Sequence, residues 1–455
     1  MIPRRILLLI ACTSLFALAA AVPAASAAEA GETSTPPDSP PPGADELLDA
    51  AFEYAQCLRD NGIDDYPDPR TDGGGLEISS PLDLNTHTNE EVAVAQSVCE
   101  PILASAAPPV EPPPDAGGGG GAGADGGPSE WEAITPGGDC ECADGSEFTF
   151  WDRDADPTRV VLYLDGGGAC TDALTCAFTG SNGESDFYTW SIGGKDPGFP
   201  GRGILDLDHA DNPFAEHSFV FVGSCTGDAD LGDSTHEYSP DLTVEHNGFV
   251  NGSAAIDHLA EHFPDATQVV VVGNTGGSVS APLYGGLVAD RLPDAEVIVI
   301  GAGSGHWPDD PDLNVAVLDE LWGAYGNMPD WDVNEGLTAG EWGIPRFWIQ
   351  AGLHDPGIVM ARFDFAYDPN AGRALESLGL DGTTLGNIDA NDAAIEAAGV
   401  DLHTFTAAGD GHRVLERDDF YVLEEGGVTL VEWLAALLAG DPLDDVRCVD
   451  CAAPS

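Results

Sequence analysis

A strand-like apolar run leads directly into a glycine-rich turn in the stretch VVVVGNTGGSVSAP, residues 269–282. A sharp turn of this kind can present a hydroxyl nucleophile if small residues stand two positions before and two after it, because strand and helix pass very close there. Gly273 and Gly277 frame Thr275 in this way. Framing Ser278 instead would put the hydroxyl about one turn into the helix, so Thr275 is the candidate nucleophile.

An acid and a histidine follow later strand-like runs, in the order that a hydroxyl nucleophile requires. Asp355 comes shortly after RFWIQAG (346–352), and His412 comes shortly after LHTFTAAG (402–409). A histidine oriented by a carboxylate can take the proton of a hydroxyl group as it attacks. Thr275, Asp355 and His412 are therefore the predicted catalytic set.

A third run, VVLYL at residues 160–164, is followed by DGGGAC. Successive glycines let backbone N–H groups approach a substrate closely, as stabilisation of an oxyanion requires. Gly167 and Gly168 are the predicted donors from this loop, and Gly276 is the predicted donor from the turn after Thr275.

Threonine at the nucleophile position carries a physical disadvantage. The position is normally strained, often with a positive φ, and a β-branched side chain there is an outlier. The extra methyl group also crowds the path of attack. We therefore expect weak activity or none, and two hypotheses of different class follow. One is an attenuated ester hydrolase, and the other is a catalytically silent binding protein.

The residues that position these groups indicate an α/β fold with a mostly parallel sheet. The apolar runs are continuous rather than alternating, which is typical of strands buried on both faces. Helical patterns at 250–262 and 282–291 alternate with the runs. The expected strands are VVLYL (160–164), SFVFVG (218–223), VVVVG (269–273), EVIVIG (296–301), RFWIQAG (346–352) and LHTFTAAG (402–409).

The N-terminal third has a different organisation. Arg4 and Arg5, the apolar residues that follow and an Ala-Ser-Ala site predict a signal peptide at 1–27, and hence a secreted, extracellular protein. Low-complexity linkers are expected at 28–43 and 107–130. They flank a small helical module at 44–106, which contains Cys57 and Cys99 and which we expect to be stapled by a disulfide. The α/β domain occupies 131–455.

Charge restricts the classes of partner. The formal net charge is -64, and loss of Arg4 and Arg5 with the signal peptide takes it to -66. Such a surface repels nucleic acid and polyanionic substrates at low ionic strength. No other segment reaches the ~20 apolar residues that span a bilayer. We expect a monomer that acts on an ester substrate and uses no cofactor.

A metal site is not expected either. Asp152, Asp154 and Asp156 imitate the beginning of a calcium loop, but Pro157 stands where that loop requires glycine and Tyr163 stands where it requires glutamate.

Nine cysteines remain after the signal peptide, and in an exported protein they favour disulfides. Cys140 or Cys142 could pair with Cys448 or Cys451 and so join the ends of the large domain. Cys170 and Cys176 could close a local loop, which leaves Cys225 without a partner.

The segment from Gly137 to Arg447 resembles the pectin acetylesterase and Notum family of carboxylesterases. The resemblance is carried by GGDCECADGSEFTFW, LDGGGAC, CTGDADLGD, GNTGGSVSAPLYGGLVADRLPDAEV and GDGHRVLERDDFY. It implies an α/β-hydrolase-like three-layer domain and carboxylesterase activity on an acylated glycan or lipid. If the threonine has abolished catalysis, it implies instead a catalytically silent protein that binds an acylated glycan or lipid. Family members typically have serine at the position of Thr275, and Asp355 and His412 match the remaining triad positions.

The small module carries a second resemblance. Its stretch AQCLRDNGIDDYPDP is similar to a helical module of exported actinobacterial proteins.

Overall fold

The structure is a computed structural model that describes two compact units, one within residues 15–124 and one within 125–455. The described residues are 52, 54–59, 61–63, 66, 70–72, 75–77, 99, 131–180, 183–185, 187–192, 201–371, 382–449 and 451. The predicted signal peptide and both predicted linkers lie outside the described residues.

The small unit has a helical stretch at residues 54–59 and a two-stranded antiparallel sheet of β1 (Arg70–Asp72) and β2 (Gly75–Glu77). A disulfide joins Cys57 to Cys99 beside a small buried cluster, which consists of Tyr54, Ala55, Leu58, Ile63, Tyr66 and Cys99. So few apolar side chains contribute little burial free energy, and a cross-link between distant residues compensates for this by restricting the unfolded chain.

The large unit is built on one nine-stranded sheet with the order β15-β12-β11-β10-β9-β5-β6-β4-β3. The seven strands from β15 to β6 run parallel, and β4 and β3 add an antiparallel edge. In chain order the strands are β3 (Glu132–Ile134), β4 (Phe150–Arg153), β5 (Asp156–Leu164), β6 (His217–Val222), β9 (Gln268–Asn274), β10 (Glu296–Ala302), β11 (Val359–Phe365), β12 (Leu402–Ala407) and β15 (Val446–Arg447). The expected α/β class with a mostly parallel sheet is confirmed.

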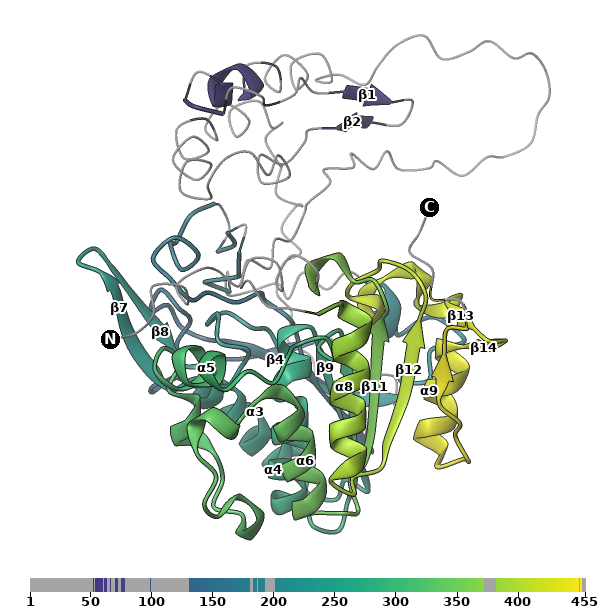
Figure 1. The fold of residues 1–455 in the computed structure, drawn as a ribbon. Coiled ribbons are helices and arrows are strands. Elements are labelled where there is room, and N and C mark those ends of the chain that lie inside the picture. The colour runs from purple at the N-terminus through teal and green to yellow at the C-terminus, as the bar shows by residue number, and fades with distance from the viewer. Residues whose placement is uncertain are drawn as a thin grey trace, which may run out of the picture. The chain divides into compact units, whose positions relative to one another are not determined.

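Helices cover both faces of this sheet (Figure 1). One face packs against α3 (Gly248–His262), α4 (Gly276–Arg291), α6 (Ile344–His354) and α8 (Thr384–Ala397), and the other packs against α9 (Leu430–Ala439). The remaining strands form two hairpins, β7 (Ser234–Ser239) with β8 (Leu242–His246) and β13 (Glu424–Glu425) with β14 (Val428–Thr429). A short helix, α5 (Pro311–Leu313), precedes a helical turn at Asn314–Asp319.

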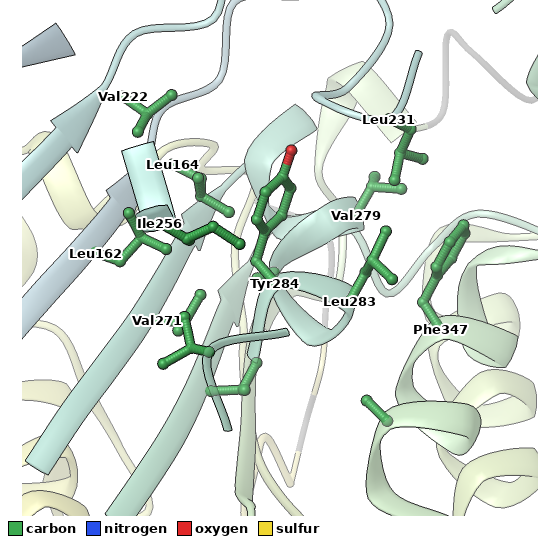
Figure 2. Close-up of a cluster of buried hydrophobic side chains, with 14 of the residues drawn as sticks. Leu162, Leu164, Val222, Leu231, Ile256, Val271, Val279, Leu283, Tyr284 and Phe347 are labelled. Carbon is green, nitrogen blue, oxygen red and sulfur yellow. The ribbon is translucent and has the colours of Figure 1, made fainter. Parts of the chain in front are cut away.

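Successive side chains of the central strands enter the two faces in turn. Leu162 and Leu164 of β5 pack with α3 and α4, whereas Val161 and Tyr163 enter the cluster that contains α9. Figure 2 shows the first cluster, in which Ile256 and Tyr284 lie against the strand residues. Both faces are apolar, which explains why the strands read as continuous hydrophobic runs.

One expected strand is a helix. RFWIQAG lies inside α6, which has Pro345 in its first turn and buries seven of its residues. A short apolar run cannot by itself distinguish a buried strand from a buried helix, and proline in the first turn favours the helix.

The strand that this assignment missed is β11, VMARFDF, whose pattern is interrupted by Arg362 and Asp364. Both side chains are buried, and they form an ion pair of 3.0 Å from Nε to Oδ2. Asp392 of α8 also contacts the Arg362 guanidinium. These charged residues interrupt the apolar pattern of β11, which is why the sequence analysis did not predict this central strand.

The disulfides correct part of the sequence prediction. Cys142 pairs with Cys225 and Cys448 with its neighbour Cys451, so neither joins the two ends of the domain. Cys170 pairs with Cys176 as expected, and Cys140 is a buried free thiol. The N–H of Ala143 donates to the carbonyl of Cys225, so Cys142 and Cys225 lie close together in the fold. They are 83 positions apart in the sequence, which is why the pair was not predicted.

Among the described residues, no helix has both the length and the apolar character needed to cross a bilayer.

Candidate active site

The carboxyl ends of five parallel strands meet at one edge of the sheet. β5 ends before Asp165, β9 before Thr275, β10 before Gly303, β11 before Ala366 and β12 before Ala408. Ligands of open α/β sheets bind beyond these ends, where several loops converge. The turn after β9 and the loops after β5, β10, β11 and β12 all contribute residues to one cavity.

Thr275 occupies a strained turn between β9 and α4. Its backbone has φ 50° and ψ -107°, and its N–H donates to the carbonyl of Ala302 at 2.8 Å. A positive φ in a β-branched residue is rare and is associated with functional turns. The structure thus holds the Thr275 backbone in the strained conformation that the sequence predicted for this turn.

The glycines that frame this turn are required by close packing. A Cβ atom at Gly273 would lie 2.3 Å from the carbonyl oxygen of Gly277. A Cβ atom at Gly277 would lie 2.2 Å from the carbonyl oxygen of Leu164 in β5. Real Cβ atoms do not approach oxygens so closely, so the strand and helix cross here only because both positions lack side chains.

Ser278, the competing hydroxyl, is fully buried inside α4. Its Oγ lies 2.7 Å from Oγ of Ser304, and that hydrogen bond occupies it. Ser278 contributes nothing to the lining of the cavity, whereas Thr275 does.

His412 pairs with Asp368. Its Nδ1 lies 2.6 Å from Oδ2 of Asp368, whose side chain is almost entirely buried. Burial would raise the pKa of Asp368, but the hydrogen bond from His412 and the charge of the imidazole lower it below its ordinary value. An ionised carboxylate only accepts hydrogen bonds, so Nδ1 donates and Nε2 is left to accept a proton. His412 and Thr275 face the same cavity, without a direct hydrogen bond between them among the described residues.

Asp355, the acid predicted from the sequence, lies elsewhere. It is the C-cap of α6, and its Oδ1 accepts a hydrogen bond from the N–H of Gly357. Asp355 precedes β11 and Asp368 follows it, so a strand of seven residues, about 20 Å long, separates the two edges on which they lie. The structure replaces Asp355 with Asp368 as the partner of His412. The error followed from assigning the strand to α6.

The predicted oxyanion glycines have different environments. Gly168 and Gly276 line the cavity beside Thr275. Gly276 is the first residue of α4, where backbone N–H groups have no partner within the helix. Gly167 instead packs against the backbone of Ser224, whose carbonyl oxygen would lie 2.6 Å from a Cβ atom there.

Gly166 lies directly against the side chain of Thr275. A Cβ atom at Gly166 would overlap Oγ1 of Thr275 at 1.5 Å and would lie 2.7 Å from the carbonyl oxygen of Asn274. We expect Gly166→Ala to abolish any esterase activity and to destabilise the fold by about 1–3 kcal/mol, because neither backbone can retreat. The measurements are thermal unfolding by circular dichroism and an aryl-ester assay.

The control is Gly276→Ala, since a Cβ atom there meets nothing closer than 3.8 Å. This variant should unfold at or above the wild-type temperature, because alanine favours helix more than glycine does. Equal stability of Gly166→Ala and the wild type would show that the glycine loop is looser than the structure indicates.

An ion-pair network that the sequence analysis missed fixes the loops beneath the cavity. Arg413 donates to Asp165 Oδ1 at 2.9 Å, to the carbonyl of Gly166 at 3.2 Å and to Glu416 Oε2. Glu416 in turn accepts hydrogen bonds from Tyr163 at 2.7 Å and Asn274 at 2.9 Å. The loop that carries His412 is thus tied to the glycine loop and to the residue before Thr275.

One guanidinium, that of Arg413, faces two carboxylates in this network. Burial and the neighbouring Glu416 carboxylate raise the pKa of Asp165. Burial is the largest influence on Glu416 and acts to raise its pKa, but the Arg413 charge and the hydrogen bonds that Glu416 forms together hold that pKa below its ordinary value. The segment HRVLE, residues 412–416, contained a sequence signal for the Arg413–Glu416 ion pair. Glu416 comes three residues after Arg413, so one helical turn brings the two charges together.

The cavity has a volume of about 100 Å³ and a largely apolar wall. Its apolar lining includes Val279, Trp307, Leu313, Val317, Leu318 and Trp322. His306 also lines it, and burial lowers the pKa of this side chain to about 4, so that its imidazole is neutral near pH 7. An apolar chamber beside a hydroxyl and an imidazole suits the acyl group of an ester.

Residues 135–323 match the pectinacetylesterase family. This stretch is therefore similar to pectinacetylesterases. It contains Thr275 and the glycine loop, while Asp368 and His412 lie beyond its matched end. No curated protein matches the chain.

Among solved structures, the Wnt deacylase Notum from Drosophila is similar in fold, with a TM-score of 0.51 at 17% sequence identity. The similarity covers 70% of this chain and 98% of the Notum chain. This likeness in fold extends beyond the stretch that matches the pectinacetylesterase family. The fold inferred from the sequence motifs is confirmed, and residues 135–323 match the family that those motifs resemble.

Proposed function

We propose that the protein is a secreted carboxylic ester hydrolase that removes a short acyl group from an acetylated glycan or lipid, with Thr275 as its nucleophile. The observation that carries the proposal is the pairing of His412 with Asp368 at the edge of the cavity onto which the strained Thr275 turn opens. The similarity of residues 135–323 to pectinacetylesterases and the deacylase activity named for the Drosophila Notum structure support the reaction class.

In the proposed reaction the Oγ atom of Thr275 attacks the acyl carbonyl, and Nε2 of His412 takes the hydroxyl proton. Asp368 holds the imidazole in the required tautomer and stabilises its charge. Backbone N–H groups of Gly168 and Gly276 would stabilise the oxyanion of the tetrahedral intermediate. His412 then protonates the departing alcohol, and water hydrolyses the acyl-threonine with His412 again as the base.

The size of the cavity favours a short acyl chain. An apolar cavity of about 150 Å³ accommodates benzene, and this one measures about 100 Å³. An acetyl to butyryl group is compatible with such a volume, whereas a long fatty acyl chain is not.

The charge of the chain favours a neutral substrate. A formal net charge of -64 repels a polyanion such as deesterified pectin at low ionic strength. The disulfides fit an oxidising compartment, which supports secretion. A neutral acetylated glycan or lipid outside the cell is therefore the preferred substrate class.

A chain-length series of p-nitrophenyl esters tests the function. We expect His412-dependent hydrolysis of the acetate and butyrate, and at least a 10-fold lower kcat/KM for the octanoate, because each methylene that does not fit the cavity costs about 1–3 kcal/mol. His412→Ala is the control for non-enzymatic hydrolysis. Undiminished turnover by His412→Ala would refute the mechanism, and a preference for the octanoate would refute the short-acyl assignment. Saturable binding of acyl compounds without turnover would favour a silent binding protein.

A further inference from the structure

Two histidines and two aspartates gather between β4 and α3, remote from the active site. His258 and His262 are four residues apart on α3, so they lie on one face of the helix. Their rings stack with centroids 5.2 Å apart and an interplanar angle of 11°. Asp152 of β4 faces them, because side chains alternate along the strand and Phe150 and Asp152 share the face that α3 covers.

From this cluster we infer a binding site for one divalent transition-metal ion, with zinc as the ion that its donors fit best. One ligand atom from each of Asp152, His258 and His262 lies within 4.8 Å of the other two. Zinc bonds to imidazole nitrogen and carboxylate oxygen are about 2.0–2.2 Å long, so two ligands of one ion can stand up to about 4.4 Å apart. A small side-chain adjustment brings all three donors to that spacing.

Asp154 lies outside this group of three but contacts His262, and a rotation of its side chain would bring a fourth ligand to the ion. Its Oδ1 lies 3.0 Å from Nε2 of His262, just as Oδ2 of Asp152 lies 2.7 Å from Nε2 of His258. Two imidazoles and two carboxylates complete a tetrahedral donor set, which zinc favours. Calcium prefers six to eight oxygen ligands, which this cluster does not supply. Zinc binds imidazole nitrogen as well as carboxylate oxygen, so these donors fit zinc better.

Electrostatics and access also favour a cation at this place. Asp152 is buried, whereas the His262 side chain is 42% exposed, so an ion can enter from solvent. His262 is the last residue of α3, and the C-terminus of a helix carries a partial negative charge. The chain as a whole is strongly acidic and concentrates cations near its surface.

The site would fasten the antiparallel edge of the sheet to α3. α3 runs for 15 residues from Gly248, whose N–H donates to Asp228, to His262. Ala229, the neighbour of Asp228, lines the active-site cavity, so a helix on the order of 20 Å long separates that cavity from the metal ligands. Metal binding there should change stability and leave the chemistry of the ester unaffected.

Another histidine–carboxylate pair on the same face of the sheet provides a matched control. His354 Nε2 lies 2.8 Å from Oδ1 of Asp290, and the pair belongs to no group of three possible ligands among the described residues. Cys170, Cys176 and His246 form the other such group, but its two cysteines are joined in a disulfide and cannot ligate.

The experiment measures zinc binding by the full chain after treatment with EDTA, with excess Mg²⁺ present to occupy the acidic surface. We expect about one zinc ion per chain by calorimetry and metal analysis, and a zinc-dependent rise in Tm. The double variant His258→Gln/His262→Gln should weaken binding by about 100-fold or more and lose the Tm response. His354→Gln should behave like the wild type in both measurements.

Cobalt provides a readout that does not depend on stability. Co²⁺ should give the visible absorption of a tetrahedral nitrogen–oxygen site in the wild type and in His354→Gln, and Asp152→Asn should change this spectrum. Zinc binding that is equal in all variants, or that Mg²⁺ abolishes, would mean that only the acidic surface binds cations. Absence of binding would mean that the cluster consists of two histidine–aspartate ion pairs. Either outcome overturns the inference.

Discussion

Asp368→Asn is expected to lower kcat on a short aryl ester by about 10⁴-fold, the loss that follows when the orienting carboxylate of a hydroxyl–histidine–acid set becomes an amide. The carboxylate accepts the Nδ1–H of His412 at 2.6 Å. An amide that donates to Nδ1 instead would favour the wrong tautomer, with the proton on Nε2, where the base must accept. The measurement is steady-state hydrolysis of p-nitrophenyl acetate.

Asp355→Asn is the matched control. Asp355 caps α6, and an asparagine there can still accept the hydrogen bond from the N–H of Gly357. We expect kcat within about threefold of the parent, as for most surface substitutions. Making both variants in a Thr275→Ser background gives the range needed to measure a large loss. A collapse of activity in Asp355→Asn but not in Asp368→Asn would show that the observed pairing of His412 is not the functional one.

Thr275→Ser is expected to raise esterase activity by roughly 5- to 150-fold. Thr275 has φ 50°, and strain at such a position is typically about 1–3 kcal/mol. Serine removes the methyl group and relaxes the β-branched constraint while the hydroxyl stays in place. If the strain falls on the transition state, its release produces the stated acceleration. The measurement is kcat/KM of both proteins on the same acetate ester.

Two further variants determine which hydroxyl reacts. Ser278→Ala should change the rate little, because that side chain is buried and bonded to Ser304. His412→Ala should abolish the gain of Thr275→Ser, because the imidazole must accept the proton of either hydroxyl. If Thr275→Ser hydrolyses no ester, the protein has lost catalysis altogether and the interpretation as a binding protein prevails.

The sequence predicted the fold wherever the interior is purely apolar. The runs at 160–164 and 269–273 became β5 and β9 because every residue in them is buried on one face or the other. Prediction failed at β11, because Arg362 and Asp364 neutralise each other inside the protein and hide the pattern. That pairing depends on the tertiary structure, and no local rule reveals it.

The missed strand β11 also determined which residues of the candidate site could be predicted from the sequence. Gly273, Thr275 and Gly277 were located by spacing alone, since the tight turn imposes a local requirement. His412 followed a strand that was placed correctly. Asp368 was missed because its strand was missed, and Asp355 took its place. The hydrogen bond from Arg413 to Asp165 joins residues that are 248 positions apart, and a single sequence does not reveal a contact between residues so distant in the chain.

The proposed nucleophile and the proposed base differ in how firmly the sheet holds them. Thr275 follows β9, which has β5 and β10 on its two sides, whereas His412 follows β12, whose outer neighbour β15 pairs with it over only Phe405 and Thr406. Local opening begins where few backbone bonds must break. Partial unfolding at the β12–β15 edge would move the His412 imidazole away from the cavity and leave the Thr275 turn intact. Mild heating should therefore abolish activity reversibly while most of the domain stays folded.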